Sequence, residues 1–157
     1  MNPGACAWVL GGICGDRIVL WHYATTKWNG KTAASMYTGP IQQALKRHRP
    51  DKAVWRIVED NDPAGYKAKA AQQAKSEVGI SVMDWPGYSP DLNPLDFSLW
   101  AEVEKRARAK VGETQVSATE YKRVLRQAAL RLPREVVKKG RREHEGPYQR
   151  LLPGQRG

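Results

Sequence analysis

The 157-residue sequence has little cysteine, three histidines and no long apolar run. Its two cysteines, Cys6 and Cys14, support neither a disulfide framework nor a zinc site, so a reducing compartment is expected. The histidines lack the spacing of metal ligands. No stretch approaches membrane-spanning length, and the first residues show no signal-peptide pattern. We therefore expect a soluble, intracellular protein without a membrane partner.

Acidic residues are scarce relative to basic ones. The chain has 26 Lys and Arg against 16 Asp and Glu, a net charge of +10. The excess lies towards the C-terminus, because residues 101–157 hold 15 of the basic residues and 7 of the acidic ones. A charge of this size indicates a polyanionic partner, most simply nucleic acid. A solvated charged face is the ordinary alternative.

The basic residues of the C-terminal region are the candidates for contacts to a DNA backbone. Such contacts would bind phosphates without reading sequence, and their affinity would fall steeply as salt rises. The candidates are Lys122, Arg123, Arg126, Lys138, Lys139, Arg141 and Arg142.

The first third of the chain has the pattern of a hairpin followed by a helix. Apolar residues predict a strand over 5–13 and a second strand over 17–23, joined by a turn at Gly15-Asp16. A helix is expected over 32–47, with a break allowed near Gly39-Pro40.

The middle of the chain reads as strand, helix, strand. Residues 53–59 are rich in β-branched and aromatic types, which favours a strand. Asp62 is placed to cap a helix with Pro63 at its first position, and Gly79 is placed to end it. A short strand is predicted over 80–84.

The C-terminal part is predicted to be helical. Asn93 is placed to cap one helix, and the capping box at 117–120 opens another that ends at Pro133. A last basic helix is expected over 134–143. One face of the helix that follows Asn93 carries, at helical spacing, Asp96, Trp100, Val103 and Ala107.

Two aspartates stand in dense local motifs. Asp60 lies in the run Val-Glu-Asp-Asn-Asp-Pro at 58–63, and Asp96 ends the run Trp-Pro-Gly-Tyr-Ser-Pro-Asp-Leu-Asn-Pro-Leu-Asp at 85–96. Taken singly, Asp60 reads as a turn former at a strand end, and Asp96 reads as a capping-box partner. Brought together, two such carboxylates can hold Mg²⁺ for phosphoryl-transfer chemistry.

These two motifs in this order resemble the catalytic domain of mariner-type DDE/DDD transposases. The signature of that family runs strand, Asp-Asn-x-Pro, helix, short strand, Trp-Pro-x-x-Ser-Pro-Asp-Leu-Asn-Pro, an acidic residue and a Leu-Trp helix. Residues 54–108 follow it, and the Leu-Trp pair is Leu99-Trp100. The resemblance implies an α/β, RNase H-like fold, with a mixed sheet flanked by helices over 1–112 and a basic helical extension over 113–157.

The resemblance also implies roles for individual residues. Asp60 and Asp96 would be the second and third acidic ligands of the catalytic site and would bind Mg²⁺ or Mn²⁺. Asn61 would help to position the loop, and Asp62 would be a cap. The 35 residues between Asp60 and Asp96 are one more than is common in the family. DNA would be the partner, a homodimer is left open, and a eukaryotic protein of this kind would be nuclear.

The sequence departs from the family pattern in two places. Ala64-Gly65-Tyr66 stands where the family often has a basic residue or histidine. The family's first catalytic Asp lies on a central strand before the hairpin, whereas the only acidic residue here before Asp51 is Asp16, in the hairpin turn. The first central strand is therefore expected to be missing. Without it, two buried strand edges would face a gap and leave backbone groups unpaired. Either strand 5–13 pairs directly with strand 53–59, or the fold is damaged.

The expected function is that of a transposase-derived domain. In the parent family the reaction is Mg²⁺-dependent DNA cleavage and strand transfer. With two of the three acidic ligands, this chain alone is expected to be inactive as a transposase or nuclease. The alternative is a non-catalytic nucleic-acid-binding module, and a protein-interaction domain ranks third.

Overall fold

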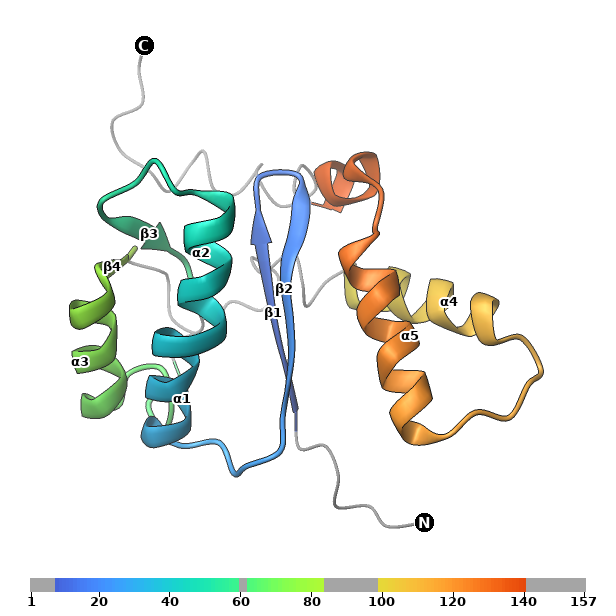
Figure 1. The fold of residues 1–157 in the computed structure, drawn as a ribbon, viewed down its shortest axis with the longest axis horizontal. Helices are drawn as coiled ribbons and strands as arrows, with labels where there is room; N and C mark the ends of the chain where they lie inside the picture. The colour runs from blue at the N-terminus through green and yellow to red at the C-terminus, as the bar shows by residue number, and fades with distance from the viewer. Residues whose placement is uncertain (1–7, 60–61, 84–98, 141–157) are drawn as a thin grey trace. The chain divides into compact units, whose positions relative to one another are not determined.

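The computed structural model of the chain describes residues 8–59, 62–83 and 99–140 (Figure 1). These residues divide into two compact units. The first unit holds residues 8–10 and 22–83, and the second holds residues 11–21 and 99–140. Asp60, Asn61, Asp91 and Asp96 lie outside the described residues.

The chain opens with the predicted β-hairpin. Strands β1 (Trp8–Cys14) and β2 (Arg17–Ala24) form a two-stranded sheet. Gly15 in the connecting turn has φ +64°, a left-handed value that residues with a side chain rarely adopt. The hairpin prediction and its turn are confirmed.

The helix after the hairpin is a single run with a kink inside it. Helices α1 (Gly30–Met36) and α2 (Gln42–His48) are joined by the π-helical turn η1 (Tyr37–Ile41). Gly39 leaves the helical conformation at φ −114° and ψ −105°, and Pro40 has no N–H for the helical ladder. The break expected at Gly39-Pro40 is therefore a kink, and the helix continues beyond it.

Two short parallel strands follow, joined by a helix. Strands β3 (Trp55–Ile57) and β4 (Ile80–Val82) pair in register, with Trp55 opposite Ile80. The connecting helix is α3 (Lys69–Val78). Gly79 ends it at φ +85°, as the sequence predicts.

The predicted start of α3 is wrong. The helix begins at Lys69 and not at Pro63, and residues 63–67 form turns. The Asp62 carboxylate accepts a hydrogen bond from the Ala64 N–H at 3.1 Å and a second one from Trp28. Asp62 therefore fixes a turn and a contact to a distant residue, and it does not cap a helix.

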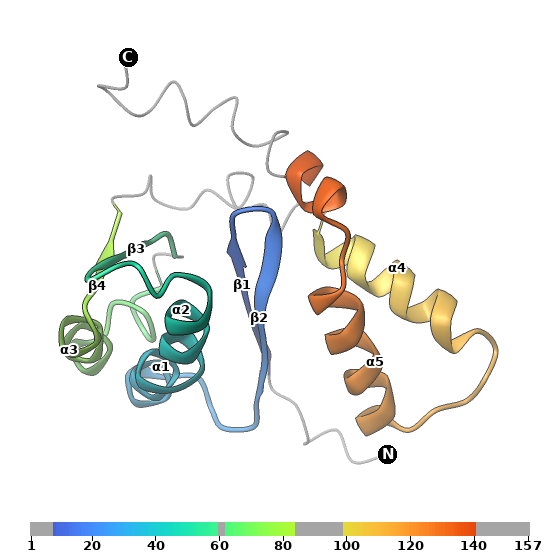
Figure 2. The same cartoon turned by 45° about the horizontal axis from the view of Figure 1, so that its top comes forward.

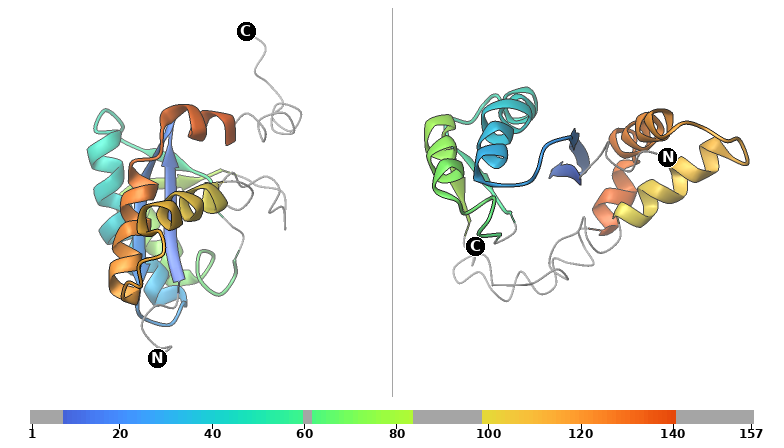
Figure 3. Two further views of the ribbon diagram at one scale, coloured as in Figure 1. Left: turned by 90° about the vertical axis from the view of Figure 1, so that its right-hand side faces the viewer. Right: turned by 90° about the horizontal axis from the view of Figure 1, so that it is seen from below.

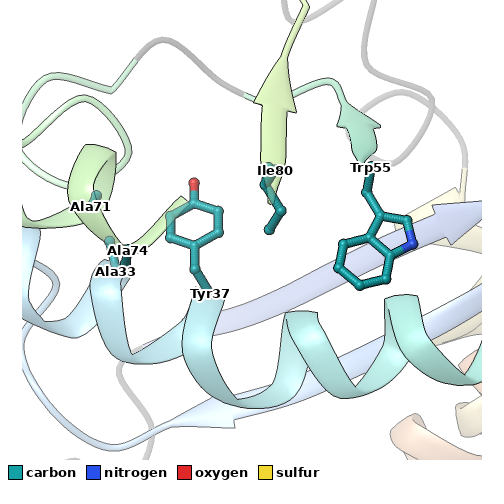
Figure 4. Packing of buried hydrophobic residues seen from close by; sticks show 6 residues of the cluster. All are labelled: Ala33, Tyr37, Trp55, Ala71, Ala74 and Ile80. Atoms are coloured by element: carbon teal, nitrogen blue, oxygen red, sulfur yellow. The ribbon is translucent and has the colours of Figure 1, made fainter. Parts of the chain in front are cut away.

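A small core holds the first unit together. Tyr37 is fully buried and lies in Figure 4 between the alanines of α3 and Ile80. Alanines on α1 and α3 let these two helices lie side by side (Figure 2). The buried residues of this core are Ala33, Tyr37, Trp55, Ala71, Ala74 and Ile80.

The second unit is built on a helical hairpin. Helices α4 (Trp100–Val111) and α5 (Ala118–Leu130) pack against each other (Figure 3). Ser117 caps α5, because its Oγ accepts a hydrogen bond from the Glu120 N–H at 3.1 Å. Residues 134–140 are helical up to the end of the described chain, as predicted. No helix in the described ranges has the length and apolar character needed to cross a membrane.

The strands of the described residues form two separate two-stranded sheets. Strand β1 pairs with β2, and β3 pairs with β4. The direct pairing of β1 with β3, one of the two arrangements expected from the sequence, is therefore not found within these residues.

Gly79 provides a test of how β4 is placed after α3. We expect Gly79→Ala to lower the free energy of unfolding by about 1–2 kcal/mol, because a left-handed backbone disfavours a Cβ. A Cβ there would also lie 3.3 Å from the Ala53 carbonyl oxygen. Gly79→Asn, which tolerates this conformation better, is the matched control and should lose less. Urea unfolding of the three proteins measures the difference, and equal stability of Gly79→Ala and the parent protein would contradict it.

Candidate functional site

The described residues on either side of positions 60–61 are Glu59 and Asp62. Glu59 follows β3, and Asp62 opens the turn that leads towards α3. Asp60 and Asp96, the residues assigned to metal binding from the sequence, lie outside the described residues, so their roles stay predictions. The structure therefore describes the surroundings of this motif only through Glu59 and Asp62.

Glu59 is held in a buried ion pair. Its carboxylate accepts hydrogen bonds from the Lys75 ammonium and from the Tyr37 hydroxyl. The Glu59 side chain is 9% exposed and the Lys75 side chain 4%. Charges removed from water to this degree are tolerated only when they are paired and hydrogen-bonded. The end of β3 is thus tied to η1 and α3 by one carboxylate.

Lys75 has further partners. Its ammonium donates a hydrogen bond to the Tyr66 carbonyl oxygen at 2.8 Å and lies 5.0 Å from the centre of the Tyr37 ring. The second contact is a cation–π interaction. Together with Glu59, these groups surround the ammonium with acceptors and ring electrons. Each polar side-chain group of the cluster Tyr37–Glu59–Lys75 therefore has a hydrogen-bond partner.

Burial and the adjacent Glu59 carboxylate raise the pKa of Tyr37 above its ordinary range. The phenol therefore stays protonated at physiological pH and keeps its hydrogen to donate. Tyr37 acts here as a fixed donor to Glu59.

Asp62 is held by an aromatic residue. The Trp28 indole N–H donates a hydrogen bond to the Asp62 carboxylate at 2.5 Å. The Trp28 ring meets Tyr66 edge-on at 4.9 Å and Trp8 at 4.4 Å between ring centres. Aromatic packing therefore holds the Trp28 indole in the position from which its N–H donates to the Asp62 carboxylate.

Gly65 explains one departure from the family pattern. A Cβ at this position would lie 2.1 Å from the Trp28 indole nitrogen, closer than two atoms can approach. The backbone of Gly65 thus lies directly against Trp28, and only glycine fits. Where the family often has a basic residue or histidine, the segment Ala64-Gly65-Tyr66 makes room for this indole.

The sequence pattern did not single out Tyr37, Lys75 or Trp28. One signal was available. Lys75 lies on the stripe of α3 formed by Ala71, Ala74 and Val78, at helical spacing, and a lysine on an otherwise small and apolar face suggests a buried partner. No comparable signal marks Tyr37 or Trp28, because their partners are distant in sequence.

No group of three or more His, Cys, Asp or Glu side chains close enough to hold a metal ion is found among the residues that the structure describes.

Several of the basic residues proposed for DNA contacts have partners in the second unit. Arg123 pairs with Glu120 at 2.5 Å. The interaction raises the pKa of Arg123 and lowers the pKa of Glu120, which favours the charged form of both side chains. Arg126 donates a hydrogen bond to the Trp21 carbonyl oxygen at 3.3 Å.

Lys138 pairs with Glu135 at 3.2 Å, and Lys139 is exposed. Lys122 on α5 is half-buried. Arg141 and Arg142 lie outside the described residues. Of the described candidates, Lys139 combines exposure with a position on the last basic helix. The DNA role of all seven residues stays a prediction.

The hairpin, the β3–α3–β4 crossover and the C-terminal helices make the described chain a mixed α/β structure. The structure matches the catalytic domain of Mos1 mariner transposase with a TM-score of 0.71 and 18% identity, over 90% of this chain and 70% of that one. It also matches the Mos1 mariner paired-end complex with Mn, with a TM-score of 0.68 and 19% identity, over 86% of this chain and 39% of that one.

The sequence comparison points the same way. The chain is 38% identical over 50 residues to the Tcb2 transposable-element transposase of Caenorhabditis briggsae. That alignment covers 32% of this chain and 18% of the Tcb2 transposase, so the chain matches less than a fifth of that relative. No protein-family model matches the sequence. The predicted fold and the predicted resemblance to mariner-type transposases are confirmed.

The buried ion pair between Glu59 and Lys75 leads to a prediction about the free energy of unfolding. Lys75→Met should lower the free energy of unfolding by about 3–5 kcal/mol, because it leaves the Glu59 charge buried without its cation. The double variant Glu59→Gln/Lys75→Met should recover part of this loss, because no uncompensated charge remains. Urea unfolding of the single and double variants gives the coupling.

The exposed pair Glu104–Arg108 on α4 is the matched control for this cycle. Its side chains are 51% and 72% exposed, so Glu104→Gln should leave the free energy of unfolding nearly unchanged. The account is wrong if Lys75→Met and Glu104→Gln are equally stable.

Proposed function

We propose that this chain is a transposase-derived domain that binds DNA and holds Mg²⁺ or Mn²⁺ through Asp60 and Asp96. The observation that carries the proposal is the pairing of two features. The sequence contains Asp-Asn-Asp-Pro at 60–63 and Ser-Pro-Asp-Leu-Asn-Pro at 89–94, and the chain has the fold of the Mos1 catalytic domain. One of the matching Mos1 structures is a paired-end complex with Mn.

The donor set fits a hard divalent cation. Carboxylate oxygens are the ligands that Mg²⁺ prefers, and it is commonly bound by one or two carboxylates together with substrate phosphates. When bound, such an ion activates a water or hydroxyl nucleophile and stabilises the leaving oxygen. In this proposal Asp60 and Asp96 bind the ion, and basic side chains of the C-terminal helices hold the DNA phosphates.

We further propose that the chain by itself does not cut DNA. The first catalytic Asp of the family's site has no motif match within the 157 residues, and Asp16 in the hairpin turn does not fit the pattern. Two carboxylates provide a weaker site than three, because each ligand adds to the charge that holds the ion.

The second candidate function is a nucleic-acid-binding module without catalysis. The net charge of +10 and the basic C-terminal region favour it. Mg²⁺- or Mn²⁺-dependent nicking of a DNA duplex by the parent chain, lost in Asp60→Ala, would contradict both this candidate and the inactivity proposed above.

Metal binding tests the assignment of the two aspartates. In a calorimetric titration with Mn²⁺, we expect Asp60→Asn and Asp96→Asn each to lower the affinity by about tenfold or more, because each removes a charged ligand. Asp51→Asn is the matched control, since it removes the same charge from an exposed residue that precedes β3 in the sequence. Equal affinities in all four proteins would exclude Asp60 and Asp96 as ligands.

DNA binding tests the role of the C-terminal helices. In a titration of a labelled duplex, the logarithm of the affinity should fall linearly with the logarithm of salt concentration. Lys138→Ala/Lys139→Ala should weaken binding at low salt and reduce that slope by about one to two units. Lys46→Ala/Arg47→Ala on α2 removes the same charge and should leave the slope unchanged. A parent protein whose binding does not depend on salt would contradict phosphate contacts.

A further inference from the structure

A cleft lies on the helical hairpin of the second unit, where the end of α4, the turn after it and the first turn of α5 meet. Its volume is about 390 Å³, which is within the range of sites for small molecules. All of its lining residues belong to the second compact unit, so the cleft is defined within that unit alone. They are Glu104, Arg108, Val111, Gly112 and Tyr121.

Gly112 sets the turn at which α4 ends. Its φ of +61° is a left-handed value that disfavours a side chain, and its N–H donates a hydrogen bond to the Arg108 carbonyl oxygen at 2.9 Å. A Cβ at this position would have no atom within 4 Å, so the backbone conformation and not crowding requires glycine. Helix α5 then packs on α4, and the Arg108 guanidinium donates a hydrogen bond to the Tyr121 hydroxyl.

Arg108 and Glu104 place a hydrogen-bond donor and an acceptor side by side in the cleft. Arg108 donates from Nε at 3.1 Å and from a terminal nitrogen at 2.7 Å, and both bonds reach the same Glu104 oxygen, Oε1. The other oxygen, Oε2, has no hydrogen-bond partner among the residues that the structure describes. Exposed pairs of this kind contribute little to stability, so both groups can bind a ligand at little cost to the fold.

The charge of the helices around the cleft favours an anionic ligand. Residues 99–140 hold 11 Lys and Arg against 5 Asp and Glu, a net charge of +6. Lys105 is exposed and lies three residues before Arg108, on the same side of α4. A nucleic-acid strand complements this charge with its phosphates, and its bases complement an aromatic side chain.

The side chains of the cleft match the face and the edge of an unpaired base. In single strands, bases stack on aromatic side chains and their Watson–Crick edges are open to hydrogen bonds. Guanine alone presents two adjacent donors on that edge, N1–H and the N2 amine, beside the acceptor O6. A carboxylate such as Glu104 can accept from both donors, and a guanidinium can donate to O6. In a duplex this edge is already paired, and guanine shows only acceptors in the major groove.

We propose that the cleft between α4 and α5 binds an unpaired guanine of a single DNA strand. The base stacks on Tyr121, its two donors bind Glu104, and its O6 accepts from Arg108. Lys105 meets a phosphate of the same strand. The inference rests on the proposed function, since it requires the chain to bind DNA, and it adds a base contact to the phosphate contacts proposed above.

The test measures the binding of labelled single strands to the full chain by fluorescence anisotropy. The strands consist of thymidines with one central guanine or, for comparison, one central adenine. The parent chain should bind the guanine strand about tenfold more tightly than the adenine strand. Tyr121→Ala should weaken binding of the guanine strand by about tenfold, because the stacking surface is lost. Glu104→Gln should bind the two strands alike, because its amide cannot accept from both donors.

Matched controls separate the base contact from general effects of charge and folding. Glu102 and Arg106 form a second exposed ion pair on α4, also at 2.7 Å, and neither residue lines the cleft. Glu102→Gln removes the same charge as Glu104→Gln and should keep the preference for guanine. Tyr121→Phe keeps the ring and should bind the guanine strand within about threefold of the parent chain. Circular dichroism verifies that each variant is folded, and if Tyr121→Ala is not, Glu104→Gln decides.

The outcomes distinguish the inference from the proposed function. If the parent chain binds DNA but does not prefer the guanine strand, or if Glu104→Gln keeps that preference, the base site is wrong and DNA binding through phosphates stands. Unchanged binding in a folded Tyr121→Ala would also contradict the base site. If the parent chain binds neither a duplex nor a single strand, the proposed DNA binding is wrong and the base site falls with it. A guanine preference that Glu104→Gln loses and Glu102→Gln keeps supports both.

Discussion

The buried ion pair between Glu59 and Lys75 is the constraint on which the first compact unit depends. It joins the end of β3 to α3, and the Tyr37 hydroxyl extends it to the kinked helix. Both charges are almost fully removed from water, so loss of either side chain would leave the other charge buried without a partner. The small residues that bring α1 and α3 together also bring Tyr37 and Lys75 within reach of Glu59. Packing and electrostatics therefore support the same geometry, and both act beside the motif that carries Asp60.

The local signals in the sequence predicted most of the secondary structure. Gly15 and Gly79 marked a turn and a helix end, because their left-handed backbone suits glycine, and Ser117 marked a helix start through its side-chain oxygen. The start of α3 was predicted wrongly for a non-local reason. Asp62 and Pro63 form a good local helix start, but Asp62 is bound by Trp28, 34 residues away in the chain. Capping rules that consider only neighbours cannot include such a partner.

The candidate site was predictable only in part. The Asp-Asn-Asp-Pro and Ser-Pro-Asp-Leu-Asn-Pro motifs identified a transposase-like chain, and the fold agrees with that identification. The residues that anchor Glu59 and Asp62 were not predicted, because Tyr37 and Trp28 find their partners far away in the sequence. Lys75 on the apolar stripe of α3 was the one visible sign of a buried polar cluster. Sequence motifs thus indicate candidate metal ligands more readily than the buried residues that pack beside them.

The most direct test of the account is paramagnetic broadening by Mn²⁺ in the nuclear magnetic resonance spectrum of the ¹⁵N-labelled chain. If Asp60 binds the ion, low Mn²⁺ concentrations should broaden the amide signals of Glu59 and Asp62, its described neighbours in the sequence, before those of α5. The same signals should stay sharp in Asp60→Asn. Amide signals of Glu59 and Asp62 that remain sharp in the parent chain, or broaden equally in Asp60→Asn, would contradict the account.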